Sequence, residues 1–406
     1  MRNILFIIIA TVTVLALPVS ASCAVNFMPY YQMTMNQGYT VFNEGQNNFL
    51  TSSLSNNVGL LTKFSKSTSL ITIYQLKYNG PSLKLDENQQ LQERSIDHIF
   101  MGKFSQGLFN NFITLEGKVD GMWEFYRESK SKQWGTGLYD FKRQGAGLGV
   151  KAALLPFLQL QGGFKQSQML FPNYKDLSAY LSSDTQVIAA ERGLQDQLFT
   201  TIDGGVDMQL WKFIISGNYN HTIKSYYEQK VILPTGVRSA TEKQAEISDR
   251  ISFNFIFPAK RGLAFGTSAA YSTRNSNQNY QYFKSANDTS PVFIADYYDI
   301  SSMEIAPFLS IIPFKNSKLA LNCNAFLISK NYGVRQAQDA QGVYTGDLLN
   351  TTLTIYTVSL KLPFNNSTFF IPKYVLQTLV SNNKFEKFVK YNYTANYIGF
   401  DLAVEY

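Results

Sequence analysis

The chain has 406 residues, of which 15% are aromatic and only 16% charged, and its formal net charge is +7. This composition excludes disorder, because aromatic residues are plentiful, and it excludes a bundle of transmembrane helices, because repeated apolar runs of about 20 residues are missing. Nucleic-acid binding is not predicted, since the lysines and arginines are scattered along the chain. With 2 histidines and 2 cysteines, the chain is also poor in the residues that build metal or redox sites.

The first segment, residues 1–24, has the features of a secretory signal peptide. Arg2 precedes an apolar stretch over residues 4–17, which is too short for an ordinary membrane-spanning helix and suits an export signal. Small residues follow this stretch, and they predict cleavage after Ala21 or after Ala24. The protein is therefore expected to leave the cytoplasm.

The rest of the chain, residues 25–406, is predicted to fold as a single exported domain. Acylation of Cys23 is an alternative to simple cleavage, although Ser20 stands three residues before it, where an aliphatic residue would favour a lipoprotein. If Cys23 leaves with the signal, only Cys323 remains, so an internal disulfide is excluded. The fold must then be stable without covalent cross-links.

Beyond residue 25 the chain alternates apolar and polar residues, a period-2 pattern that predicts β-strands. A soluble sandwich would bury the apolar face of each strand, whereas a transmembrane barrel turns that face toward lipid and encloses a wet lumen with the polar face. The pattern repeats about 16 times, with roughly 14 and 18 as the limits. In chain order, the predicted strands lie near residues 27–37, 52–64, 69–78, 95–104, 112–126, 137–154, 157–167, 197–210, 212–226, 246–257, 262–273, 298–312, 318–329, 352–362, 368–378 and 393–406.

Short and long connections alternate between these strands. Residues 65–68 and 210–212 are short connections with turn-forming residues, whereas residues 79–94, 228–244 and 272–291 are long and polar. This layout is typical of an antiparallel up-and-down barrel in the outer membrane, with short turns facing the periplasm and long loops facing outward. An even number of strands places both ends of the barrel domain on the side of the short turns.

Aromatic residues gather at the strand ends, as expected for the two boundaries between membrane and water. Those near the short turns are Phe157, Trp211, Phe213, Phe257, Phe314, Phe364 and Phe369. Those near the long loops are Tyr78, Tyr126, Tyr226, Tyr271, Tyr297, Tyr298, Tyr391 and Tyr393. An aromatic-rich soluble core is the alternative explanation, but it does not account for two groups at opposite strand ends.

The final strand alternates most cleanly, and its apolar face consists of Ile398, Phe400, Leu402, Val404 and Tyr406. In a barrel this strand pairs with the first one, which removes the exposed edges of the sheet. A terminal aromatic preceded by apolar residues at every second position resembles the C-terminal strand of bacterial outer-membrane β-barrel proteins. The resemblance covers about ten residues and implies a class rather than a narrower family. It further implies recognition by the barrel-assembly machinery and a location in the cell outer membrane, in contact with its lipid.

The polar faces of the strands provide the candidate functional surface. Charges of both signs and many hydroxyl and amide groups would keep water inside a barrel of this size. Such a surface predicts a porin-like channel for passive diffusion of small hydrophilic solutes, with selectivity set by the charges. The candidate pore-lining residues are Glu116, Lys118, Asp120, Glu124, Lys165, Asp203, Asp207, Lys224, Arg250, Glu304, Lys361 and Asp401.

Catalytic chemistry is not predicted, and neither is a cofactor or a metal. His221 shares the apolar face of its strand near a long loop, where a hydrogen-bonded boundary histidine is expected. His98 follows Asp97 directly, but neighbours on a strand point to opposite faces and cannot form a dyad. The glycine-rich run 145–150 precedes no helix, so close packing or strand bending explains it better than a phosphate loop.

Three other functions remain open at this stage. A transporter for hydrophobic compounds would have an N-terminal plug, for which the Met- and Tyr-rich residues 26–42 are candidates, and apolar patches in its lumen. An adhesion or structural barrel would act through its loops, and an outer-membrane hydrolase is disfavoured by the scarcity of histidine. The long loop over residues 168–196 either folds into the bore or forms an external surface helix. Porin-like barrels are often homotrimers, which is an expectation by analogy alone.

Overall fold

The computed structural model describes residues 25–43, 49–81, 94–127, 132–174, 193–260, 262–282, 292–314, 317–386 and 391–406. The predicted signal peptide, residues 1–24, lies outside these described residues, as does the central part of the 168–196 loop. Among the described residues, no helix has the length and apolar character needed to cross a bilayer.

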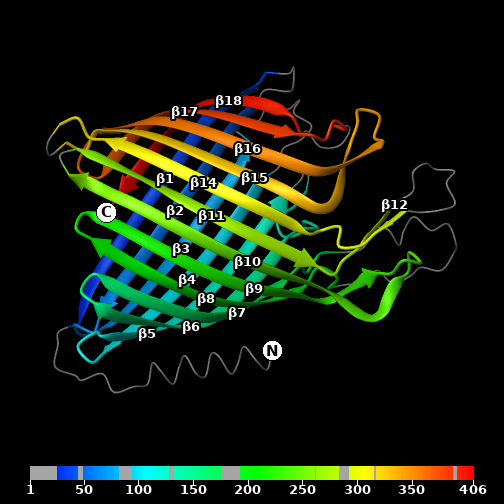
Figure 1. The fold of residues 1–406 in the computed structure, drawn as a ribbon. Helices are drawn as coiled ribbons and strands as arrows, with labels where there is room; N and C mark the ends of the chain where they lie inside the picture. Colours follow the sequence, from blue (N-terminus) through cyan, green and yellow to red (C-terminus); the bar gives the residue numbers. More distant parts are fainter. Residues whose placement is uncertain are drawn as a thin grey trace.

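Sixteen antiparallel strands close into one barrel, which confirms the predicted fold class and strand number (Figure 1). Each predicted strand overlaps one barrel strand. The barrel strands are β1 Asn26–Phe42, β2 Phe49–Lys63, β3 Thr68–Pro81, β4 Arg94–Leu108, β5 Ile113–Arg127, β6 Phe141–Leu155, β7 Leu158–Leu170, β8 Gln197–Leu210, β9 Phe213–Ile232, β10 Arg238–Lys260, β11 Leu263–Ser276, β14 Ile300–Ile311, β15 Ala320–Gln338, β16 Tyr344–Pro363, β17 Thr368–Ser381 and β18 Tyr393–Glu405. Two further short strands, β12 Tyr280–Tyr282 and β13 Val292–Ile294, form a separate small sheet between β11 and β14.

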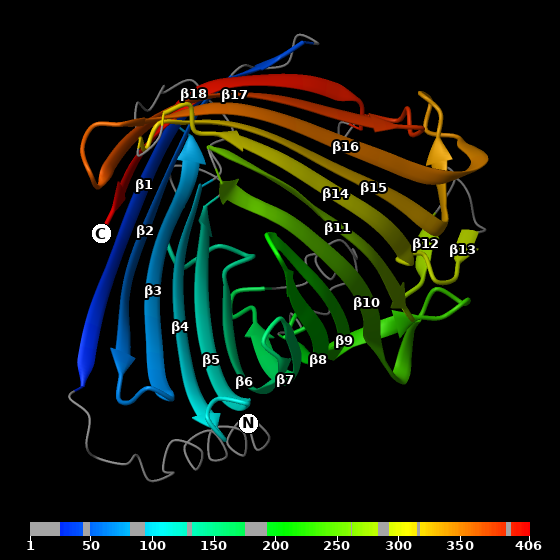
Figure 2. The same ribbon diagram turned by 60° about the vertical axis from the view of Figure 1, so that its left-hand side comes forward.

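The barrel closes because β18 pairs with β1, in the register that runs from Gln32 opposite Glu405 to Phe42 opposite Ala395 (Figure 2). The backbone of Tyr406 extends this pairing: its N–H donates to the Tyr31 carbonyl at 2.8 Å, and the Tyr31 N–H donates to the Tyr406 carbonyl at 3.2 Å. Closure gives the edge strands a partner for their backbone N–H and C=O groups, which lipid cannot provide.

The outer face of β18 is apolar. Phe400 packs against Phe370 of β17 with ring centroids 5.3 Å apart, and Ile398 and Tyr406 are 67% and 72% exposed. Exposure of this kind is stable only against hydrocarbon, because water would penalise so large an apolar surface. The predicted alternation of the last strand is therefore confirmed.

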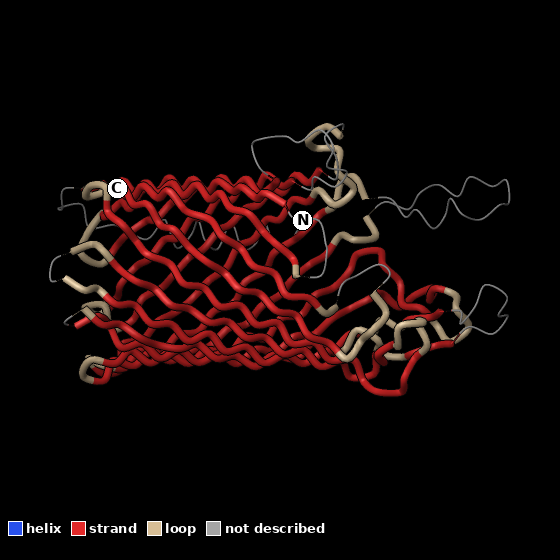
Figure 3. The backbone as a smooth tube through the Cα atoms, turned by 90° about the horizontal axis from the view of Figure 1, so that it is seen from above, coloured by secondary structure: helices blue, strands red, loops and turns tan. Residues whose placement is uncertain are grey.

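Short and long connections lie at opposite ends of the barrel, as predicted. Figure 3 shows compact connections at the end that holds the C-terminus, the periplasmic side, and extended segments at the extracellular end. Two of the long connections between predicted strands are extended hairpins, however. Residues 228–244 belong mostly to an extended hairpin of β9 and β10 that turns at residues 233–237, and residues 330–351 belong mostly to a hairpin of β15 and β16. Their polar composition, and the Pro-Thr-Gly sequence at the turn of the first hairpin, made these segments look like loops in the sequence. In the first hairpin, the pairing of β10 with β9 shifts register between Arg238 and Ala245.

The segment between β11 and β14 is fastened to the β9–β10 hairpin by Gln278. Its side chain is buried; the amide nitrogen donates to the Lys230 carbonyl at 3.1 Å and to Gln244 Oε1 at 3.0 Å, and its oxygen accepts from the Ile232 N–H at 2.9 Å. These bonds hold the extracellular segments together as one layer above the barrel.

Aromatic rings add a second connection within this extracellular layer. Tyr280 stacks on Tyr297 at 4.4 Å between ring centroids, and the Arg335 guanidinium lies 5.3 Å from the Tyr297 ring. Burial raises the pKa of the Tyr297 phenol, so this ring stays neutral in the layer.

Replacing Gln278 with alanine is expected to loosen the extracellular layer while the barrel stays folded. The change removes the partner of partly buried backbone groups at Lys230 and Ile232 of β9, at a local cost of about 1–3 kcal/mol. Limited proteolysis of the folded barrel should then cut its extracellular segments faster. The exposed Gln341→Ala is the control, and equal cutting rates for the two variants would contradict the role of Gln278.

The predicted aromatic groups are partly wrong, because several of these rings face inward. Tyr226 is buried with its hydroxyl on Glu246, Tyr393 lines an internal cavity, and Phe369 is only 3% exposed beneath Lys361. A tyrosine's face depends on its parity along the strand, and closeness to a loop does not reveal this parity. Exposed tyrosines that do share the outer face include Tyr39, Tyr74, Tyr219, Tyr271, Tyr356 and Tyr374.

Candidate functional site

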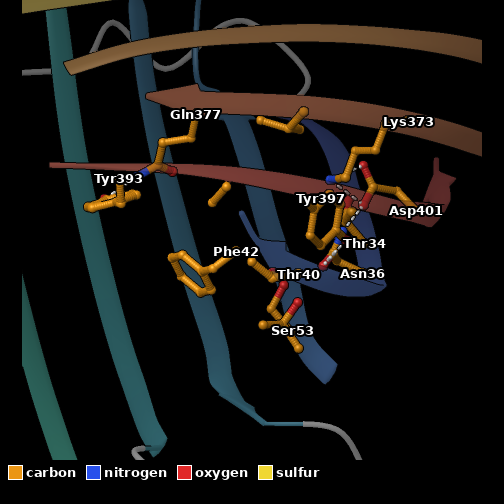
Figure 4. Close-up of a pocket in the computed structure, with 13 residues that line it drawn as sticks. Thr34, Asn36, Thr40, Phe42, Ser53, Lys373, Gln377, Tyr393, Tyr397 and Asp401 are labelled. Carbon is orange, nitrogen blue, oxygen red and sulfur yellow. Dashed lines mark hydrogen bonds and ion pairs between the residues drawn. The ribbon is translucent and has the colours of Figure 1, made fainter. Parts of the chain in front are cut away.

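An internal cavity at the closure of the barrel identifies the face that points into the bore. Asp401 of β18 accepts from Lys373 Nζ at 2.8 Å and from Asn36 Nδ2 at 2.6 Å, and the Tyr397 hydroxyl donates to Asn36 Oδ1 at 3.0 Å. Figure 4 shows these side chains converging from β1, β17 and β18. The residues that line this cavity are mainly polar.

From Asp401 the inner face can be followed from strand to strand, because residues paired in an antiparallel ladder share one face. Asp401 pairs with Asn36, and Asn36 pairs with Ser53; the register continues in this way around the barrel and returns to β18. All the predicted pore-lining residues lie on this inner face. Their participation in conduction remains a prediction.

The densest charge cluster forms on β4, β5 and β6 around Glu116, whose carboxylate is only 4% exposed. Three ammonium groups surround it: Lys103 at 2.6 Å, Lys118 at 3.2 Å and Lys151 at 3.3 Å. We call these four residues the Glu116 cluster. Carboxylates of low exposure need such partners, since an unpaired buried charge is strongly destabilising.

Asp120 forms a second centre two inner positions further along β5, beyond Lys118. Its carboxylate lies 2.5 Å from Lys165 Nζ and 3.8 Å from the Arg143 guanidinium. Together with the Glu116 cluster this makes five cations around two carboxylates, and Asp97 and Glu124 add two further carboxylates to the same inner face nearer the extracellular end.

Three glycines of β6 face this charged region, and Gly145 lies closest to the charged side chains. Gly145, Gly147 and Gly149 occupy consecutive inner positions, and a Cβ on Gly145 would lie 3.0 Å from Asp120 Oδ1 and 3.1 Å from Lys165 Cε. The interpretation of residues 145–150 as a close-packing run is confirmed.

Elsewhere the inner charges occur mostly as pairs. Arg250 makes a two-pronged contact with Glu304 at 2.9 and 2.6 Å across β11. The remaining pairs join Lys224 with Glu246 at 3.2 Å and Lys361 with Glu405 at 3.4 Å. For Glu124, Asp203 and Asp207, an inner position is the only finding that bears on the prediction.

Sequence reasoning missed several inner partners of these residues. Lys103 was not predicted to line the bore because the alternation near residues 95–104 is irregular: the apolar residues Ile99 and Met101 share its inner face. Arg143, Lys151 and Lys373 lie on predicted strands, but no inner position was assigned to them; only Arg143 and Lys151 share the parity of the nearby glycines Gly145 and Gly149.

Both histidines lie on the outer face near the extracellular end of the barrel. His221 Nδ1 is 2.8 Å from Asp249 Oδ1, which also accepts from the Tyr219 hydroxyl at 2.6 Å. His98 Nδ1 is 2.7 Å from the Tyr74 hydroxyl, and Asp97 points to the opposite face. The prediction of a hydrogen-bonded boundary histidine is confirmed for His221.

The outer face between the two ends of the barrel is mainly apolar. Val58, Ile202 and Val358 are 51%, 54% and 46% exposed there, next to exposed residues of the same kind on neighbouring strands. A closed barrel with an apolar exterior and a charged interior is the arrangement that a bilayer stabilises. The chain is a bacterial outer-membrane β-barrel. Its apolar face contacts the lipid of that membrane.

No protein-family model matches the chain, and no curated protein sequence does. Among solved structures, OmpT of Vibrio cholerae is 11% identical with a TM-score of 0.44, over 95% of this chain and 99% of OmpT. OpdO of Pseudomonas aeruginosa is 11% identical with a TM-score of 0.44, over 93% of this chain and 97% of OpdO. CdiB from Acinetobacter baumannii is 9% identical with a TM-score of 0.48, over 96% of this chain and 66% of CdiB. These are similarities of fold alone.

Proposed function

We propose that this outer-membrane barrel is a porin-like channel through which small hydrophilic solutes diffuse passively, without catalysis or a cofactor. The observation that supports it best is the charged and hydrogen-bonding inner face of a closed barrel of sixteen strands. Barrels of this size are wide enough to hold a column of water when their inner face is polar. Insertion by the barrel-assembly machinery and assembly as a homotrimer belong to the same proposal.

The rival with an N-terminal plug loses its main support. Residues 26–42 form β1, a wall strand paired with β2 and β18 along most of its length. The segment therefore belongs to the barrel wall, in agreement with the strand predicted near residues 27–37, and the plug that the alternative function requires would have to come from elsewhere.

Planar-bilayer recording of the purified barrel tests the channel directly. We expect stable ohmic current steps in potassium chloride, because a wet bore conducts at all voltages. A correctly folded barrel, verified by its heat-modifiable gel shift, that produces no steps would refute the proposal.

Glu116→Gln should increase the preference of the channel for anions. The change removes the one carboxylate that pairs with three lysines, so the bore loses one negative charge. One charge within a Debye length changes the local ion concentration roughly twofold, and the anion-to-cation permeability ratio should rise by about that factor. Lys118→Gln is the matched control of opposite sign and should lower the ratio. Reversal potentials in a salt gradient measure both, and shifts in the same direction would contradict the assignment.

A further inference from the structure

The inner face of β1–β4 carries an apolar patch that a purely hydrophilic channel does not require. It consists of Tyr30, Leu61, Ile71, Ile73, Ile99 and Met101, which we call the inner apolar patch. The register joins these residues across neighbouring strands, since Leu61 pairs with Ile71 and Ile73 pairs with Met101. Tyr30 and Met101 are each 43% exposed toward the bore. Contiguous apolar surface exposed to water is unfavourable and usually marks a place where an apolar group binds.

The patch lies directly beside the lysines of the Glu116 cluster. Ile71 pairs with Lys103 of the Glu116 cluster, and Met101 pairs with Asp120, the partner of Lys165. Paired residues are about 4.5–5.5 Å apart at Cα, so the apolar and cationic surfaces adjoin within the length of one small molecule.

We propose that the channel preferentially admits small amphipathic organic anions, which have an apolar body and one anionic group. The apolar body lies on the inner apolar patch while the anionic group faces Lys103, Lys118 and Lys151. This inference rests on the proposed channel function and adds the class of solute. An inorganic anion would gain nothing from the patch, and a neutral apolar solute would gain nothing from the lysines.

Single-channel recording with added benzoate tests the inference on the reconstituted barrel. Benzoate should reduce the chloride current at a concentration about tenfold lower than acetate does, since burying part of its ring adds apolar contact that acetate lacks. Benzyl alcohol has the ring without the charge and should be as weak as acetate. Equal potency of benzoate and acetate on the unmodified channel would overturn the inference while the channel itself stands.

Two serine variants locate the effect. Ile73→Ser should remove most of the advantage of benzoate over acetate and leave the conductance in chloride nearly unchanged. The matched control is Ile355→Ser on β16, which makes the same change on the inner face next to Phe326 and away from the Glu116 cluster. Loss of the advantage in the control alone, or its retention in Ile73→Ser, would contradict the assigned patch. A folded barrel without chloride conductance would overturn the channel and this inference together.

Discussion

A chain that stops at Asn392, and therefore lacks β18, will fail to form a heat-modifiable barrel. Without β18, β1 and β17 each lose the partner on one side, and both strands become open edges of the sheet. Each unpaired backbone group in hydrocarbon costs several kcal/mol, so the remaining strands cannot form a stable membrane structure. Refolding into detergent or vesicles followed by an unboiled gel shows this as loss of the faster-migrating band.

A control deletion separates this effect from general sensitivity to shortening. Ala340 and Gln341 are exposed at the tip of the β15–β16 hairpin, beyond the barrel wall. Their removal should leave the gel shift intact. If the chain without β18 still migrates as a folded barrel, then closure by β1 and β18 is not what stabilises the protein.

Val358→Arg should destabilise the barrel by about 2–4 kcal/mol, the usual cost of a basic residue on the lipid face near the bilayer midplane. Val358 lies on the outer face of β16, between Cys323 of β15 and Tyr374 of β17, and is 46% exposed. Arginine at this position cannot reach either membrane surface without distortion. Equilibrium unfolding in denaturant from lipid vesicles measures the difference in free energy.

The adjacent variant Thr357→Arg is the matched control. Thr357 points into the bore between Asn324 and Val375, where a guanidinium can stay hydrated. Its free energy of unfolding should therefore change by less than about 1 kcal/mol. Equal destabilisation by the two arginines would contradict the assignment of lipid and bore faces on which the whole architecture depends.

Local alternation predicted most of the wall, and its failures have specific causes. Where the period was clear, as in β5 and β18, both the strand and its inner face were found. The irregular inner face of β4 concealed Lys103, and a polar, proline-containing hairpin concealed the extension of β9 and β10. Tyr226 and Tyr393 were assigned to the membrane boundary although their side chains point inward.

The amino-acid sequence by itself determined that this chain is a barrel of strands with an apolar and a polar face. That information is local, because the side chains of a strand alternate with a period of two regardless of its neighbours. Only the tertiary structure decided which charges meet, since Glu116, Lys103 and Lys151 come from three strands whose relative register depends on closure of the whole barrel. The same register placed Ile71 beside Lys103 and joined the inner apolar patch to the Glu116 cluster.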